Sequence, residues 1–208
     1  LIGGEWVAGN GRFKVVDPAT GLALADVANL EPTHCHAAIM AAEKAWAPWR
    51  GKTAKERGAI MMKWFALLHQ HADDLARIMT AEQGKPLAES AGEVMYGASF
   101  IEWFAEEGKR IYGDVIPTHL PDRRILTIKQ SVGVVAAVTP WNFPNAMITR
   151  KAAPALAAGC PVVIKPASET PLSALALAVL AEEAGVPAGV FNVITTRDSR
   201  GVGKELTE

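Results

Sequence analysis

The chain has 208 residues, 50% of them hydrophobic, with 21 Lys and Arg against 22 Asp and Glu and a formal net charge of −1. This length and hydrophobic content suffice for a large buried core. The near-zero charge gives no electrostatic reason to expect a nucleic acid or an anionic membrane as a partner, so a small-molecule ligand is the better expectation.

The start of the chain and its cysteines predict a soluble, cytoplasmic protein. Residues 1–6 have neither the basic leader nor the apolar stretch of a secretory signal, although the missing initiator Met is compatible with a trimmed upstream segment. The longest uncharged, mostly apolar stretch, residues 152–164, is too short to cross a bilayer. Two cysteines, Cys35 and Cys160, cannot build a disulfide framework and fit a reducing compartment.

Residues 1–113 predict short strands followed by helices. Residues 5–7 and 12–16 flank a Gly-Asn-Gly sequence that tolerates the positive φ of a tight hairpin, and residues 17–21 predict a second turn. From residue 32 to about 109, apolar residues return every three or four positions, which indicates amphipathic helices. Breaks between these helices are expected at residues 51–53, 71–74 and 83–86.

Residues 114–131 predict a separate pair of strands. Residues 114–118 and 124–130 have the composition of strands, and the Leu-Pro-Asp-Arg sequence between them predicts a connecting turn.

Residues 132–208 alternate strands with helices, with strands expected at 132–138, 161–165 and 189–194. The first is apolar and β-branched without polar alternation, so we expect it to be covered on both faces. This alternation implies right-handed crossovers and an α/β fold with a doubly wound, Rossmann-like parallel sheet.

Two helices should connect these strands. The first covers residues 145–158 and contains Pro154, which should end or kink it. The second has Thr170 as a plausible N-cap, Pro171 at its first position and Gly185 at its end.

Ligands of open parallel sheets bind beyond the carboxyl ends of the strands. Residues 139–144, after the first strand, contain no glycine and are not the G-x-G-x-x-G turn of a conventional dinucleotide fold. Two prolines and two aromatics make this loop stiff, and its one amide side chain, Asn142, could donate to a developing oxyanion. Asn142 could instead cap the helix that follows.

The second strand ends at Lys165, and Ser168 follows shortly after it. A lysine at that edge could bind ribose hydroxyls or a phosphate, and Ser168 adds a short neutral hydroxyl. The alternative is an exposed lysine at a strand end, which is the more frequent case.

Several segments resemble the aldehyde dehydrogenase superfamily in order and spacing. They are Thr-Pro-Trp-Asn-Phe-Pro at 139–144, Arg150-Lys151, residues 154–160, Lys-Pro-Ala-Ser-Glu-Thr-Pro at 165–171, and residues 184–192. Residues 3–7, 17–21 and 82–90 resemble the same superfamily, so the similarity spans nearly the whole chain.

The resemblance implies roles for particular residues. Asn142 would share in binding the oxyanion of the tetrahedral adduct, and Lys165 would hold the adenosine ribose. Superfamily members that prefer NAD often carry a glutamate where Ser168 stands, and its carboxylate repels a 2′-phosphate. We therefore expect NADP to be accepted, with NAD as the alternative because Glu169 follows. The residues implied in cofactor binding are Thr139, Pro140, Trp141, Lys165, Pro166, Ala167 and Ser168.

Within the superfamily, residues 147–151 and 191–193 are most similar to succinate-semialdehyde dehydrogenases. This resemblance implies that Arg150 grips the distal carboxylate of a semialdehyde with two parallel hydrogen bonds. The alternative is a solvated helix arginine that pairs with a nearby acid. Glutarate semialdehyde and an uncharged aldehyde are alternative substrates.

The superfamily's chemistry needs a nucleophilic thiolate, a glutamate that activates water and a glycine-containing phosphate loop, and none is visible. Cys35 and Cys160 are interpreted as buried structural thiols, and residues 201–204 fit a helix start better than a phosphate loop. We therefore expect the N-terminal portion of an NAD(P)-dependent aldehyde dehydrogenase, truncated at Glu208 before its catalytic domain. The alternative is a non-catalytic nucleotide-binding or oligomerisation module.

Two further expectations concern metals and assembly. The pairs His34/His36 and His69/His71 are two residues apart, which on a helix points them in different directions, so no metal site is expected. Residues 114–131 resemble the superfamily's protruding arm, so the full protein is expected to form a homodimer or homotetramer.

Overall fold

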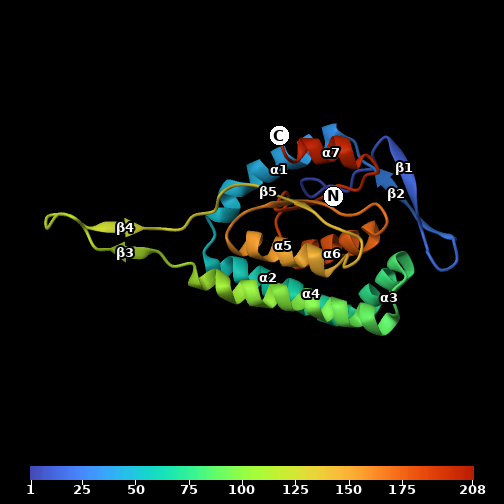
Figure 1. Cartoon of the computed structure of the whole chain (residues 1–208), viewed down its shortest axis with the longest axis horizontal. Coiled ribbons are helices and arrows are strands. Elements are labelled where there is room, and N and C mark those ends of the chain that lie inside the picture. Colours follow the sequence, from blue (N-terminus) through green and yellow to red (C-terminus); the bar gives the residue numbers. More distant parts are fainter.

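A parallel sheet of three strands lies at the centre of the computed structural model, which describes residues 1–208 (Figure 1). Its order is β5 (Val135–Val138), β6 (Val162–Lys165) and β7 (Phe191–Val193). Helix α5 (Ala146–Ala157) connects β5 to β6, and α6 (Pro171–Glu183) connects β6 to β7. This arrangement confirms the predicted α/β fold with a Rossmann-like parallel sheet.

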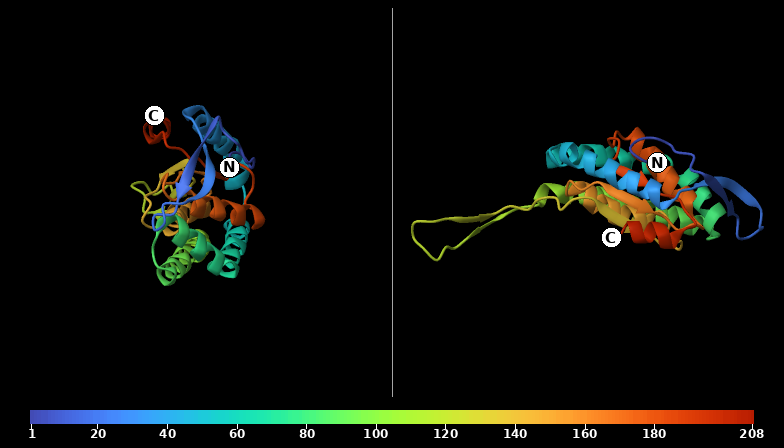
Figure 2. Two further views of the ribbon diagram at one scale, coloured as in Figure 1. Left: turned by 90° about the vertical axis from the view of Figure 1, so that its right-hand side faces the viewer. Right: turned by 90° about the horizontal axis from the view of Figure 1, so that it is seen from above.

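Helices cover both faces of the sheet (Figures 1 and 2). Helix α1 (Pro32–Arg50) packs on one face beside α7 (Ser199–Glu205), while α5 and α6 pack on the other. Helices α2 (Ala54–Gln70) and α4 (Leu87–Glu107) form a further layer against α5 and α6, and α3 (Ala72–Gln83) packs against α4 and α6. The breaks between α1, α2, α3 and α4 fall where the sequence predicts them. None of these helices is both long and apolar enough to span a membrane.

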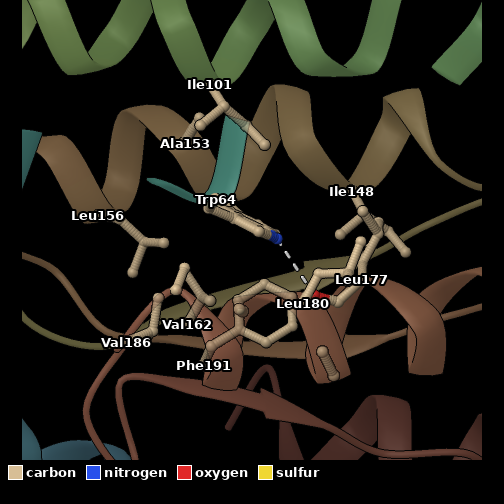
Figure 3. Close-up of a cluster of buried hydrophobic side chains, with 14 of the residues drawn as sticks. Trp64, Ile101, Ile148, Ala153, Leu156, Val162, Leu177, Leu180, Val186 and Phe191 are labelled. Atoms are coloured by element: carbon tan, nitrogen blue, oxygen red, sulfur yellow. Dashed lines mark hydrogen bonds between the residues drawn. The ribbon is translucent and has the colours of Figure 1, made fainter. Parts of the chain in front are cut away.

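The indole of Trp64 on α2 lies at the centre of the main core (Figure 3). Its Nε1 donates to the carbonyl oxygen of Leu177 on α6 at 3.2 Å, and its ring meets that of Phe191 edge-on with centroids 5.4 Å apart. The hydrogen bond satisfies the one polar atom of a fully buried side chain. The side chains drawn around it come from α4, α5, α6, the turn after α6 and the sheet, and include Ile101, Ile148, Ala153, Leu156, Val162, Leu180 and Val186.

The N-terminal hairpin differs from the prediction. Strand β1 (Gly11–Val16) pairs antiparallel with β2 (Ala23–Asn29), not with residues 5–7. The turn that closes the hairpin is 17–21, where Gly21 has φ 73° and donates its N–H to the Asp17 carbonyl at 2.8 Å. Because β2 occupies the pairing edge of β1, residues 5–7 are left to pack elsewhere, and Trp6 Nε1 donates to Glu182 Oε2 on α6 at 2.9 Å.

A long two-stranded arm extends away from the body after α4 and the 3-10 turn Gly108–Arg110 (Figures 1 and 2). It contains β3 (Asp114–Ile116) and β4 (Ile125–Thr127), paired antiparallel. The predicted strands are therefore present but shorter. Apolar side chains lie exposed along the arm, including Val115 at 72% and Leu126 at 67%, so nothing in this chain covers them.

The first strand of the parallel sheet is shorter and more exposed than predicted. Residues 132–134 lie outside β5, Val132 is 88% exposed and Val138 is 53% exposed. The expectation that this strand is covered on both faces is wrong, because α5 packs against β5 on one face while α1, on the other face, packs against β6 and β7, both of which are buried throughout.

Pro154 does not end helix α5, which continues to Ala157. The start and end of α6 agree with the prediction in part: Pro171 is the first residue and Gly185, with φ 90°, follows the last turn. Thr170 stands at the N-cap position, but its side chain makes no capping hydrogen bond.

Candidate cofactor and substrate site

The carboxyl ends of β5 and β6 bring two predicted site segments together. Val138 pairs with Lys165 in the parallel register, and Thr139 N donates to the Lys165 carbonyl oxygen at 3.1 Å. Loop 139–144 and segment 165–168 therefore share one edge of the sheet, the edge at which parallel folds bind ligands.

Lys165 is a buried lysine and not the exposed strand-terminal residue of the alternative interpretation. It is 4% exposed, forms no ion pair and donates from Nζ to the Pro166 carbonyl oxygen at 3.3 Å. Burial lowers the pKa of its ammonium, and the charge of Glu169 acts in the opposite direction. A buried cation with one internal acceptor has N–H groups left for a ligand.

A cavity of about 600 Å³ opens beside these strand ends. Trp141 lines it from the first loop, and Ser168 lines it from the second. Ser168 Oγ donates to Glu169 Oε2 at 3.2 Å. Two cations, Lys14 of β1 and Arg197 beyond β7, line the same cavity.

The remaining predicted cofactor residues differ in exposure. Thr139 is buried and its Oγ1 has no hydrogen-bond partner within the chain. Pro140 is exposed, Pro166 is buried and Ala167 is half-buried. An orphaned hydroxyl beside a buried lysine is an arrangement that a polar ligand would complete.

Asn142 does not cap the helix that follows it. Its side chain is exposed and its amide makes no hydrogen bond within the chain, while Asn145 occupies the N-cap position of α5. The amide N–H groups of Asn142 are therefore available to an external acceptor.

Arg150 is the fifth residue of α5, about one turn from the start of the helix, and is exposed. Its guanidinium carbon is 5.8 Å from the centre of the Phe100 ring of α4, and it pairs with no carboxylate. The Met147 amide donates to the Phe143 carbonyl at 3.0 Å, which ties the end of loop 139–144 to the first turn of α5. Met147 and Arg150 are three residues apart and therefore lie on one face of the helix.

Two buried glutamates, which sequence reasoning did not identify, cap the helices that follow the site loops. Glu93 Oε1 on α4 accepts from Asn145 N at 2.9 Å and Ala146 N at 3.2 Å, at the start of α5. Glu82 on α3 accepts from Leu172 N and Ser173 N, both at 2.7 Å, at the start of α6. Negative charge is favoured at a helix N-terminus by the free N–H groups and the helix dipole.

Lys85 connects this capping arrangement to loop 139–144. Its Nζ is hydrogen bonded to Glu93 Oε2 and donates to the Asn142 carbonyl oxygen at 2.9 Å. The same ammonium lies 4.4 Å from the centre of the Phe143 ring, a cation–π contact. Lys85 lies in segment 82–90, which resembles the superfamily, but neither Lys85 nor Glu93 was predicted as a site residue; the available signal was an acidic residue beside the apolar stripe of a helix.

Both cysteines are buried and unpaired. Burial raises the pKa of the Cys35 thiol to about 11, so it remains protonated at neutral pH. Residues 201–204 lie within α7, where Asp198 accepts from Gly201 N at 2.8 Å as the helix cap.

Comparisons with known proteins cover the whole chain. The model described as "Aldehyde dehydrogenase family" matches residues 6–208. The chain is 62% identical to the NADP(+) succinate-semialdehyde dehydrogenase GabD of Escherichia coli K12, over 100% of this chain and 43% of that protein. It is 60% identical to a glutarate-semialdehyde dehydrogenase of Pseudomonas putida, over 99% of this chain and 43% of that protein.

A solved structure described as an E. coli NADP dependent enzyme superposes with a TM-score of 0.98 at 61% identity, covering 100% of this chain and 43% of that one. The chain therefore spans less than half the length of the relatives it matches.

The Glu82 cap predicts a pH dependence of stability. Burial raises the pKa of the Glu82 carboxyl from 4.5 to about 7, while the hydrogen bonds from Ser173 and Leu172 oppose this shift. A raised carboxyl pKa contributes stability that is complete below pH 4.5 and is lost as the pH rises through 7. Relative to Glu82→Gln, the free energy of unfolding of the wild type should fall by about 3 kcal/mol over this range.

Urea unfolding of the full-length protein at several pH values measures this difference. Glu102→Gln, an exposed position on α4, is the matched control and should differ from the wild type equally at every pH. Parallel pH profiles for the wild type and Glu82→Gln would show that Glu82 does not titrate in this range.

Proposed function

Because the chain belongs to the aldehyde dehydrogenase family, we propose that it is the N-terminal, cofactor-binding part of a longer enzyme that oxidises a semialdehyde to its carboxylic acid. The observation that carries this proposal is the exposed, unpartnered amide of Asn142 at the strand edge that also holds Lys165. An amide fixed at that edge can donate to the oxyanion that forms when a nucleophile adds to an aldehyde. We infer that the nucleophilic thiol and the base that activates water come from the remainder of the enzyme.

We propose NADP as the cofactor, with NAD as the alternative cofactor. The buried hydroxyl of Thr139 and the unpaired ammonium of Lys165 fit the ribose and phosphate oxygens of a dinucleotide. Ser168 carries no negative charge itself, and the cations Lys14 and Arg197 line the same cavity as the carboxyl groups of Glu82 and Glu169. These features support acceptance of a 2′-phosphate. When bound, the oxidised nicotinamide accepts the hydride of the aldehyde carbon.

We propose a semialdehyde with a distal carboxylate, succinate or glutarate semialdehyde, as the substrate. Arg150 is exposed and carries no internal carboxylate partner. It is the fifth residue of α5, the helix that directly follows loop 139–144 and its Asn142. An arginine on this helix can bind the distal carboxylate of a short dicarboxylic semialdehyde whose aldehyde carbon lies near Asn142. The two relatives compared above are named for these two substrates.

Arg150→Gln in the full-length enzyme tests the substrate. Loss of charge-assisted hydrogen bonds should lower kcat/KM for succinate and glutarate semialdehyde about 10- to 100-fold, through a higher KM. Propanal, which has no carboxylate, should be little affected. Arg200→Gln on the exposed side of α7 removes the same charge and should leave both substrates unchanged. An unaltered KM for the carboxylated aldehydes would reject the role of Arg150.

Ser168→Glu tests the cofactor. A carboxylate at this position should repel the 2′-phosphate and lower the ratio of kcat/KM for NADP to that for NAD by at least about tenfold. Ser168→Ala adds no charge and should keep the ratio of the wild type within about threefold. Steady-state kinetics with both cofactors provides the measurement, and an equal ratio in all three proteins would contradict the assignment.

We further propose that residues 1–113 and 132–208 together form the cofactor-binding part of the enzyme, and that arm 114–131 pairs with a neighbouring subunit. The exposed apolar side chains of the arm support this pairing. Leu126→Glu should therefore reduce the molar mass of the full-length assembly from that of a dimer or tetramer, measured by light scattering. An unchanged mass would argue against the arm as the subunit contact.

A further inference from the structure

The buried ammonium of Lys85 contacts three groups, and all three lie in or next to loop 139–144, which carries Asn142. They are the Glu93 carboxylate, the Asn142 carbonyl oxygen at 2.9 Å and the Phe143 ring face. The Lys85 side chain is 10% exposed and that of Glu93 is 1% exposed. Two hydrogen bonds and the ring face surround the ammonium, so the charge of Lys85 is neutralised and held within this chain.

A buried ion pair contributes little to the net stability of a fold. Removing each charge from water costs several kcal/mol, and well-packed apolar side chains of similar volume often stabilise a protein as well or better. The atoms that this pair fixes are main-chain atoms on both sides of residues 143–144: the carbonyl of Asn142, and the amides of Asn145 and Ala146. The pair therefore acts on the geometry of the loop as well as on stability.

Lys85 is itself held firmly at the turn between α3 and α4. Its amide donates to Gln83 Oε1 at 2.8 Å. Gly84, before it, has φ 88°, and a Cβ at this position would lie 2.8 Å from Cγ of Pro18. A glycine is therefore required there both by the backbone conformation and by the close approach of the hairpin turn.

We propose that Lys85, supported by Glu93, is a positioning residue that aims the Asn142 amide at the reacting oxygen. This inference rests on the proposed function, in which Asn142 donates to the oxyanion. The hydrogen bond to the Asn142 carbonyl fixes the peptide plane from which that side chain projects, and the side chain keeps no internal partner of its own. A donor aimed in advance needs no reorganisation when charge develops on the substrate oxygen.

A double-mutant cycle in the full-length enzyme tests the inference, with Lys85→Met, Asn142→Ala and the two combined. Asn142→Ala should lower kcat about 100- to 1000-fold. Lys85→Met should lower kcat about tenfold or more, with the KM of aldehyde and cofactor changed less than about threefold. Because Lys85 acts through Asn142, the double variant should have nearly the kcat of Asn142→Ala alone.

The controls separate positioning from folding. Lys109→Met removes a lysine that is ion-paired on the surface with Glu106, and should leave kcat unchanged. If Lys85→Met does not fold, the cycle is run with Glu93→Gln, which keeps an oxygen for the amides of α5 while weakening the hold on Lys85. In that case Glu93→Gln should lower kcat as expected for Lys85→Met and lose this effect in the Asn142→Ala background.

Independent, multiplying effects of the two substitutions would overturn the role of Lys85 and leave that of Asn142 intact. A raised KM with unchanged kcat in the Lys85 variant would overturn it as well. An unchanged kcat in Asn142→Ala alone would reject the oxyanion role itself, and with it the inference. Failure of the oxyanion role therefore shows in the Asn142 variant, and failure of the positioning role shows in the Lys85 and double variants.

Discussion

Two carboxylates from outside the sheet, Glu82 and Glu93, hold the starts of the helices on which the candidate site depends. Each accepts two hydrogen bonds from main-chain amides at the N-terminus of α6 or α5. Such amides have no partner within their own helix, and at a buried helix end no water replaces it. Neither helix has a side-chain cap of its own. The layer of α3 and α4 therefore fixes both helices, and the cost of burying two carboxylates is offset by four amides that would otherwise be unsatisfied.

This capping explains how irregular loops can hold fixed positions. Loop 139–144 runs from the end of β5 to the start of α5, and segment 165–170 runs from the end of β6 to the start of α6. The strand ends are joined by the parallel ladder, in which Val138 pairs with Lys165, and the helix starts are joined to Glu93 and Glu82. Each loop is thus short and fixed at both ends. The side chain of Asn142 can then stay without an internal hydrogen bond, and that of Ser168 with only its neighbour Glu169 as a partner, while both loops keep a fixed position.

Local patterns in the sequence predicted the parallel sheet, its connecting helices and the arm strands, because periodicity and turn residues act over a few positions. They failed where a partner lies far along the chain. Glu93 and Asn145 are 52 residues apart and Glu82 and Ser173 are 91 apart, so no local pattern could pair them. The hairpin prediction failed for a different, local reason: two turn sequences compete for β1, and only the second brings a strand with enough residues to pair along its length.

The position of Glu93 depends on how closely α4 approaches α5, and a single glycine permits that approach. A Cβ on Gly97 of α4 would lie 2.1 Å from Oδ1 of Asn145 and 3.2 Å from Oγ1 of Thr149. A larger residue there would force the Asn145 side chain to rotate away or the two helices to separate, because helix packing distances are set by the side chains at the crossing. Gly97 lies one turn beyond Glu93, so a separation of the helices would draw the carboxylate away from the first amides of α5. Lys85 would then lose its anchor, and with it the hold on the Asn142 carbonyl. Gly97 is in this way linked, through the carboxylate of Glu93 and the ammonium of Lys85, to the loop that carries Asn142.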